Sequence, residues 1–325
     1  MMNFPTWDVT AYKAKAAKGG VRFARIDVFK SNTEIFSDGG YLTDSGTHVQ
    51  IPGADDPMLK GTEVFSEKIK VPKLGPIVAA GTETSVINDD SFRVARQMLE
   101  EGLNPAVLNL ASPRTAGGGY HRGSGAQEES LCRASTLSRS LYQYFSPEMA
   151  QVASVPFKER AYPLHDRYGG IYSPGVTVFR DSADGYRLMD NPYKVGVITV
   201  AALNFADREK YGQAIDAKYR TEDGGFTPEG EEIMKDKIRT IYSLAIIHGH
   251  DSLVLGAFGC GAYNLRPDLV APLFRDVLDE DEFFGRFKDI RFAILEHGKP
   301  EETGVNGKFA PFYEKFNKNK IYEKG

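Results

Sequence analysis

From about residue 76 onward, short apolar runs alternate with segments whose apolar residues recur every three or four positions. Runs of the first kind are typical of strands buried on both faces of a sheet, and segments of the second kind are typical of amphipathic helices. The predicted strands are Val107–Ala111, Val176–Phe179, Val195–Val200, Leu253–Leu255 and Ile290–Leu295. This alternation predicts an α/β fold, in which helices cover a largely parallel or mixed sheet.

The predicted helices are Ser91–Glu101, a segment from Leu131 to Phe145, Glu231–His250 and a segment that begins at Pro267. Candidate capping residues at 88–90 and a first-turn proline support the first and last of these. Residues 1–75 are polar and rich in turn residues, so we expect an N-terminal extension (1–75) packed on a main domain (76–325). Tyr162–Tyr172 and Ala206–Gly230 interrupt the pattern, either as solvated loops or as walls of a binding site.

The composition excludes several classes of protein. With 41% hydrophobic and 26% charged residues among 325, the chain is neither disordered, a coiled coil nor a collagen. A net charge of −4 argues against bulk binding of nucleic acid. Two cysteines, Cys132 and Cys260, exclude a disulfide framework, and no apolar stretch is long enough to span a membrane. We therefore expect a soluble cytoplasmic protein with no membrane, nucleic-acid or metal partner.

The loop after the predicted strand Val107–Ala111 holds five glycines within nine positions, at 117, 118, 119, 123 and 125. Because glycine has no Cβ, the backbone can approach a ligand closely there and can aim successive N–H groups at an anion. A helix is predicted to begin near Gln127, and helix N-termini favour negative charge. Ligands of such sheets bind beyond the carboxyl ends of the strands, so this loop is the first candidate site.

Glu128 and Glu129 follow this loop directly. Adjacent side chains on a helix diverge by about 100°, so the two carboxylates cannot do the same job. One could act as a general acid/base while the other holds a sugar hydroxyl. Alternatively, both only stabilise the dipole of the helix.

A second glycine-rich loop, Gly256–Asn264, follows the predicted strand Leu253–Leu255. It is not a Walker loop, and it lacks the third glycine of a dinucleotide-binding fingerprint. Two such loops at strand ends of one sheet predict that a diphosphate is held from both sides. Phe258 and Tyr263 are candidates for stacking on a ribose or base, although core packing suits Phe258 equally well.

Gly117-Gly118-Gly119, a short spacer and Gln127-Glu128-Glu129 together resemble the signature of the microbial-type poly(ADP-ribose) glycohydrolases, which are macrodomain proteins. The likeness extends over most of the chain, through the blocks Val107–Ser112, Ser130–Ser135, Tyr172–Asp181 and Leu255–Tyr263. Thr115-Ala116 departs from the family, which usually has Asn-Pro directly before the glycines. The spacer Tyr120–Ser124 is also more polar than usual. These differences bear on substrate preference more than on the chemistry.

The resemblance implies a macrodomain-like three-layer α/β/α sandwich with a mixed central sheet and an N-terminal extension. It implies a glycoside hydrolase that cleaves O-glycosidic bonds of poly(ADP-ribose) or of ADP-ribosylated proteins and releases ADP-ribose, with no cofactor or metal. Glu129 would be the acid/base that protonates the leaving oxygen, and Glu128 would position ribose hydroxyls. The implied substrate-binding residues are Asn109, Ser112, Thr115, Gly117, Gly118, Gly119, Gln127, Gly256, Phe258, Gly259, Cys260, Gly261, Ala262 and Tyr263.

Two alternatives stand beside this hypothesis. A reader protein would bind ADP-ribose through the same loops without cleaving it, but the presence of both glutamates argues against this. A cysteine hydrolase would use Cys260 with a histidine such as His121 as its base. No obvious base lies near Cys260 in the sequence, and small buried cysteines often only pack.

Overall fold

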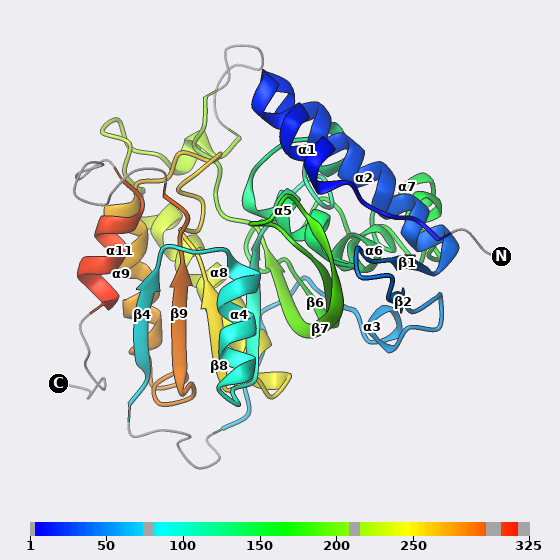
Figure 1. The fold of residues 1–325 in the computed structure, drawn as a ribbon. Coiled ribbons are helices and arrows are strands. Elements are labelled where there is room, and N and C mark those ends of the chain that lie inside the picture. Colours follow the sequence, from blue (N-terminus) through cyan, green and yellow to red (C-terminus); the bar gives the residue numbers. More distant parts are fainter. Residues whose placement is uncertain (1–3, 74–80, 208–214, 297–306, 318–325) are drawn as a thin grey trace. The chain divides into compact units, whose positions relative to one another are not determined.

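A computed structural model of the protein describes residues 4–73, 81–207, 215–296 and 307–317. Its strands form a seven-stranded sheet in the order β3-β6-β7-β5-β8-β9-β4 and a separate two-stranded sheet of β1 and β2 (Figure 1). The chain divides into two compact units. The first comprises Met1–Val64, Ala111–Leu164 and Ile171–Val197, and the second comprises Phe65–Leu110, His165–Gly170 and Ile198–Gly325.

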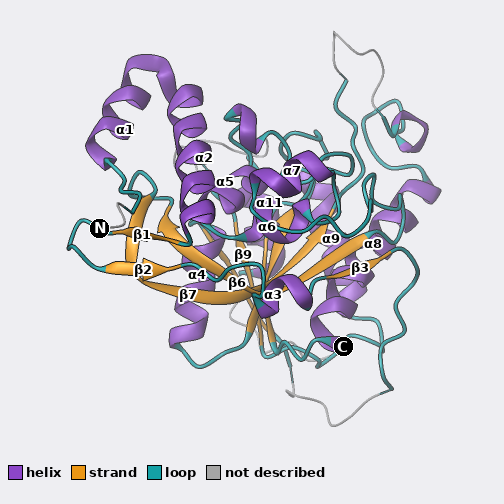
Figure 2. Cartoon of the chain, turned by 90° about the vertical axis from the view of Figure 1, so that its right-hand side faces the viewer, coloured by secondary structure: helices purple, strands orange, loops and turns teal. Residues whose placement is uncertain are grey.

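In the second unit, four strands pair in parallel. They are β5 (Pro105–Leu110), β8 (Ser252–Leu255), β9 (Asp289–Ala293) and β4 (Glu83–Ile87), with Pro105 opposite Ser252 and Ser252 opposite Asp289. Helix α4 (Ser91–Glu100) covers one face of these strands (Figure 1). On the other face lie α8 (Pro228–Ile247), α9 (Pro267–Leu278) and α11 (Phe309–Phe316) (Figure 2).

In the first unit, β6 (Gly170–Asp181) and β7 (Arg187–Val200) are neighbours joined by the short connection 182–186, so they run antiparallel. With the parallel strands above, they make the large sheet a mixed one. The remaining strands are β1 (Gly40–Leu42), β2 (His48–Gln50) and β3 (Glu63–Phe65). The helices of this unit are α1 (Val9–Lys15), α2 (Val21–Asp38), α3 (Pro57–Lys60), α5 (Gln127–Ala134), α6 (Leu137–Tyr142) and α7 (Pro147–Val152).

The α/β class predicted from the sequence is confirmed, and each of the five predicted strands overlaps an observed one. The predicted strands Val107–Ala111 and Ile290–Leu295 extend past the C-terminal ends of β5 and β9. The sequence did not predict β4, because Glu83–Ile87 is an edge strand whose polar composition hides it. The single helix predicted from Leu131 to Phe145 was wrong. It breaks at Ser135, which is extended (φ −148°, ψ 179°) and pairs with Val178 of β6. A tertiary backbone pairing therefore overrides the local helical pattern.

The N-terminal residues contain more helix than their polar composition indicated. Helix α2 has eighteen residues, and it buries Ala24, Val28 and Ile35 while Val21 and Phe23 near its start are exposed. Its C-terminal end joins an apolar cluster with β6 and the small sheet, made of Ile35, Phe36, Tyr41, Val49, Ile51, Phe179 and Leu188. This cluster fixes α2 on the first unit, next to the loop considered below.

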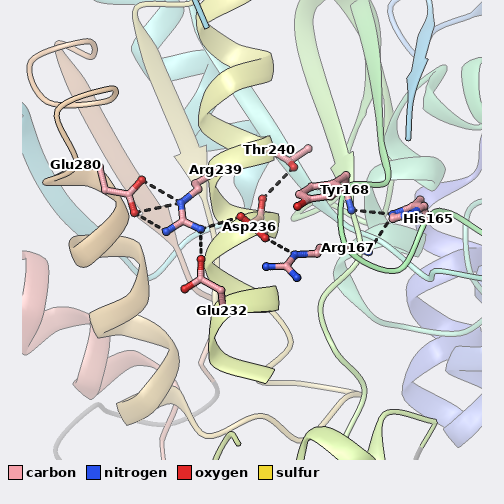
Figure 3. A network of polar contacts seen from close by, with 8 residues as sticks. All are labelled: His165, Arg167, Tyr168, Glu232, Asp236, Arg239, Thr240 and Glu280. Atoms are coloured by element: carbon pink, nitrogen blue, oxygen red, sulfur yellow. Dashed lines mark hydrogen bonds and ion pairs between the residues drawn. The ribbon is translucent and has the colours of Figure 1, made fainter. Parts of the chain in front are cut away.

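The first of the two interrupting segments, Tyr162–Tyr172, is partly anchored by charge. Within the second unit, Arg167 pairs with the buried carboxylate of Asp236 on α8, which also accepts a hydrogen bond from Arg239 at 2.7 Å (Figure 3). Nδ1 of His165 accepts hydrogen bonds from the backbone N–H groups of Arg167 and Tyr168. Residues 165–168 are therefore tied to α8 rather than freely solvated. Of the second segment, Ala206–Gly230, residues 208–214 lie outside the described residues.

Within the described part of the chain, no helix combines the length and the apolar character that crossing a membrane requires.

Candidate active site

The loop between β5 and α5 wraps its backbone around two carboxylates. Glu128 accepts hydrogen bonds from the N–H groups of Ser112 (2.7 Å) and Gly117 (3.1 Å), one on each oxygen. Oε1 of Glu129 accepts from the N–H of Gly119 at 2.7 Å. The N–H of Gly118, between them, donates to the carbonyl oxygen of Thr115 at 2.9 Å. In the structure, the N–H groups of Gly117 and Gly119 are thus directed at the two glutamates.

Glycine is required at the centre of this loop by both space and conformation. Gly118 has a positive φ of 57°, which side-chain-bearing residues rarely adopt. A Cβ there would lie 2.5 Å from Oε1 of Glu129 and 3.0 Å from Oε2 of Glu128. The three consecutive glycines thus allow the backbone to approach the carboxylates, as the sequence indicated, although the partners are internal.

Glu128 and Glu129 differ in what remains of their hydrogen-bonding capacity. Both side chains are buried in the first turn of α5, and Glu129 is only 6% exposed. Whereas Glu128 engages the loop with both oxygens, Oε2 of Glu129 is buried and has no hydrogen-bond partner among the described residues. A buried carboxylate oxygen without a partner is costly, which makes it a candidate contact for a ligand.

The side chains of Cys132 and Tyr142 lie against the loop at Gly117. A Cβ on Gly117 would lie 3.4 Å from both Sγ of Cys132 and the hydroxyl oxygen of Tyr142. Burial raises the pKa of the Cys132 thiol well above its usual value, and the neighbouring charges of Glu128 and Glu129 raise it further. Cys132 therefore stays a neutral thiol that packs beside the loop.

A buried polar network, which was not predicted from the sequence, supports the loop. Arg180 on β6 donates to Oδ1 of Asn32 (2.7 Å) and to Oγ of Ser31 (2.7 Å), both on α2. Asn32 in turn donates to the hydroxyl of Tyr120 (2.7 Å) and to the carbonyl oxygen of Arg133 (2.9 Å). An arginine that follows the apolar run Val176–Phe179 was the available signal, because a buried guanidinium needs several acceptors.

Arg133 holds the other end of the loop. It is almost fully buried on α5, and it donates to the carbonyl oxygen of Ser124 at 2.7 Å and to the hydroxyl of Tyr186 at 2.8 Å. Together, Arg133 and Arg180 fix the loop to α2, α5 and the turn after β6. The glutamates are therefore held by elements that are far apart in the sequence.

Replacing Arg180 by methionine should lower the free energy of unfolding by about 3 kcal/mol, because Asn32, Ser31 and the carbonyl of Tyr186 lose their donor in a buried site. Urea unfolding of the two proteins measures this difference. The matched control is Arg187→Met on β7, whose guanidinium is exposed and pairs with Asp44 and Asp184; it should cost less than about 1 kcal/mol. Equal losses in both variants would refute the supporting role of Arg180.

The second glycine-rich loop belongs to the second unit, as does Asn109. Asn109 is buried on β5 and donates to Oγ1 of Thr199 at 3.2 Å. Gly259 has a φ of 75°, and a Cβ there would lie 2.4 Å from Leu265. Phe258 is fully buried with its ring edge-on to Phe274, so the core-packing alternative describes its observed surroundings.

The remaining residues of this loop differ in exposure. Gly261 and Ala262 are exposed, Tyr263 is half-buried, and Gly256 and Cys260 are buried. In the first unit, the predicted residues Ser112, Thr115, Gly117, Gly118, Gly119, Gln127, Glu128 and Glu129 come together around the first loop. The structure thus assembles the predicted site residues as two groups, one in each unit.

Comparison with known proteins places the chain in a family. The model of the microbial-type PARG catalytic domain matches residues 30–181. A crystal structure of a variant of the poly(ADP-ribose) glycohydrolase from Thermomonospora curvata is 30% identical, with a TM-score of 0.68 and coverage of 91% of this chain and 100% of that chain. The chain belongs to the microbial-type PARG family. No curated protein sequence gives a significant match.

Two further PARG structures contain ligands. The Thermomonospora curvata enzyme bound to the inhibitor ADP-HPD is 29% identical over 91% of this chain and all of that chain, with a TM-score of 0.68. A PARG variant from Deinococcus radiodurans in complex with ADP-ribose is 30% identical, with a TM-score of 0.59. The match covers 82% of this chain and 98% of that chain. The matched PARG region, 30–181, contains the first loop, both glutamates, Asn32 and Arg180.

Proposed function

We propose that this member of the PARG family is a glycoside hydrolase that cleaves the O-glycosidic bonds of poly(ADP-ribose) and releases ADP-ribose. Family membership supports the reaction, since its solved relatives are poly(ADP-ribose) glycohydrolases. The observation that carries the assignment of the acid/base is the carboxylate of Glu129, with one oxygen fixed by Gly119 and the other buried without a partner among the described residues. Such a carboxylate is oriented and still able to carry a proton.

In the proposed reaction, protonated Oε2 of Glu129 donates its proton to the bridging oxygen as the bond between that oxygen and C1 of the ribose breaks. Positive charge develops on the ribose, which becomes oxocarbenium-like. A water molecule then adds its oxygen to C1 and returns a proton to Oε2. The hydrogen bond from Gly119 to Oε1 keeps the carboxylate in place through both steps.

Glu128 has a positioning role in this proposal. Its two oxygens hold the N–H groups of Ser112 and Gly117, which keeps the loop closed around Glu129. Each carboxylate oxygen has a second lone pair, so Glu128 can also accept a ribose hydroxyl as the sequence predicted. In the second unit, the exposed residues Gly261 and Ala262, with Tyr263, are proposed as contacts for a diphosphate.

The substrates proposed are poly(ADP-ribose) and ADP-ribosylated proteins, handled in the cytoplasm without direct contact to nucleic acid. A turnover panel tests this. Purified protein is incubated with poly(ADP-ribose) and with proteins that carry ADP-ribose on serine, arginine or glutamate, and released ADP-ribose is quantified by chromatography. Release from the polymer is the expected result. If ADP-ribose binds in calorimetry but no substrate is turned over, the chain is a reader protein instead.

Cys260→Ala should leave the turnover of poly(ADP-ribose) within about twofold of wild type. Burial raises the pKa of the Cys260 thiol, which donates to the carbonyl oxygen of Phe258 in its own loop, so it is a poor nucleophile. Steady-state kinetics on the polymer measures the change. Loss of activity with retained ADP-ribose affinity would favour the cysteine hydrolase.

A further inference from the structure

Three arginines surround the polar spacer that separates the glycines from the glutamates. Nε of Arg22 on α2 donates to the carbonyl oxygen of Arg122 at 2.9 Å. Arg25 lies one helical turn further along α2, on the same side as Arg22. One nitrogen of its guanidinium lies 2.2 Å from the place that a Cβ on Gly125 would take. In the same way, the carbonyl oxygen of Arg22 lies 2.2 Å from the place that a Cβ on Gly123 would take. We call Arg22, Arg25 and Arg122 the arginine rim.

The rim carries positive charge that the protein itself does not neutralise. None of the three guanidinium groups has a carboxylate within salt-bridge distance among the residues that the structure describes. Asp27 on α2 is paired with Lys15, and Asp184 is paired with Lys13 and Arg187. Burial and the charge of Arg122 lower the pKa of His121, which is consistent with a positive potential at the rim. In a chain of net charge −4, these arginines without a salt-bridge partner among the described residues create a local positive potential that attracts anions.

The rim also lies next to the proposed acid/base. Gly119, whose N–H holds Glu129, accepts a hydrogen bond on its carbonyl oxygen from the N–H of Ser124. Ser124 immediately precedes Gly125, on which Arg25 rests. The glycine that holds Glu129 and the glycine that Arg25 contacts therefore belong to one short stretch of loop, residues 119–125.

We propose that the arginine rim binds phosphates of the ADP-ribose unit adjacent to the one being released. The proposal rests on the function proposed above. Guanidinium groups bind phosphate oxygens through short, charge-assisted and often bidentate hydrogen bonds. Poly(ADP-ribose) continues past the cleaved bond with a further diphosphate, whereas a single ADP-ribose on a protein offers none there. The polar spacer, which departs from the family pattern, is thereby assigned a role in binding the polymer.

The double variant Arg25→Gln/Arg122→Gln tests this; Arg22 is kept because its Nε links α2 to the loop. We expect kcat/KM for poly(ADP-ribose) to fall about 10- to 100-fold at low salt, mainly through KM. The difference from wild type should shrink between about 50 and 200 mM salt. The calorimetric Kd for ADP-ribose and kcat/KM for a mono-ADP-ribosylated protein should change less than about twofold.

The matched control is Arg93→Gln/Arg96→Gln on α4, which removes the same charge from arginines that already pair with Asp89 and Glu100. It should behave as wild type. A loss of ADP-ribose affinity in the rim variant would show that the rim binds the released unit, and a loss confined to the modified protein would show that it binds acidic protein side chains. Either result, or unchanged polymer kinetics, overturns the proposal. If wild-type protein does not cleave the polymer, the proposed function fails instead.

Discussion

Glu129→Gln is expected to lower kcat on poly(ADP-ribose) by about 10²- to 10⁴-fold, the usual contribution of a general acid/base. The glutamine oxygen can still accept the hydrogen bond from Gly119, and its amide group replaces the oxygen that has no partner among the described residues. The geometry of the loop is therefore kept, while the proton that the leaving oxygen needs is lost. The Kd for ADP-ribose should stay within about threefold, so the loss appears in kcat.

Steady-state kinetics on the polymer, together with calorimetry of ADP-ribose binding and urea unfolding, separates these effects. The control is Glu100→Gln, an exposed glutamate at the end of α4 that pairs with Arg96. It should leave all three measurements near the wild-type values. A Glu129→Gln enzyme that turns over normally would remove Glu129 from the mechanism.

Glu128→Gln is expected to act differently, although the two residues are adjacent and chemically identical. Both oxygens of Glu128 accept loop N–H groups, from Ser112 and Gly117. A glutamine has only one acceptor oxygen, so its NH2 group must face one of these donors. The loop then opens around Glu129. We expect KM to rise and kcat to fall by about tenfold each, and the free energy of unfolding to drop by about 1–3 kcal/mol.

Comparing the two variants distinguishes a role in catalysis from a role in holding the loop closed. Glu129→Gln should change kcat with stability and ADP-ribose affinity retained, whereas Glu128→Gln should change all three. Kinetics, calorimetry and urea unfolding on both proteins measure this. If Glu128→Gln leaves stability and KM untouched, Glu128 does not hold the loop closed.

The sequence predicted the residues of the candidate site but not the contacts that hold them in place. Glycines at a strand end and paired glutamates at a helix start are local patterns, so their coincidence could be found without a structure. The direction of the loop N–H groups could not be predicted, because it depends on how α5 packs against the loop that precedes it. The network from Arg180 to Asn32 joins residues on β6 and α2, and no local pattern connects them.

The helix break at Ser135 has the same cause. Its flanking residues have helical spacing, and only the pairing with Val178 on β6 reveals why the backbone is extended. Likewise, Phe258 follows a strand and resembles a stacking residue in the sequence, yet its ring is buried against Phe274. In each case tertiary contacts, which a single sequence does not display, decide between two locally reasonable structures.

The role of Glu129 as the acid/base is tested most directly by a single-turnover measurement of ADP-ribose release, with enzyme in excess over poly(ADP-ribose). Because every polymer end is occupied, neither binding nor product release limits the observed rate. If Glu129 is the acid/base, the wild type releases ADP-ribose rapidly, and Glu129→Gln releases it about 10²- to 10⁴-fold more slowly. Equal single-turnover rates in the two proteins would contradict it.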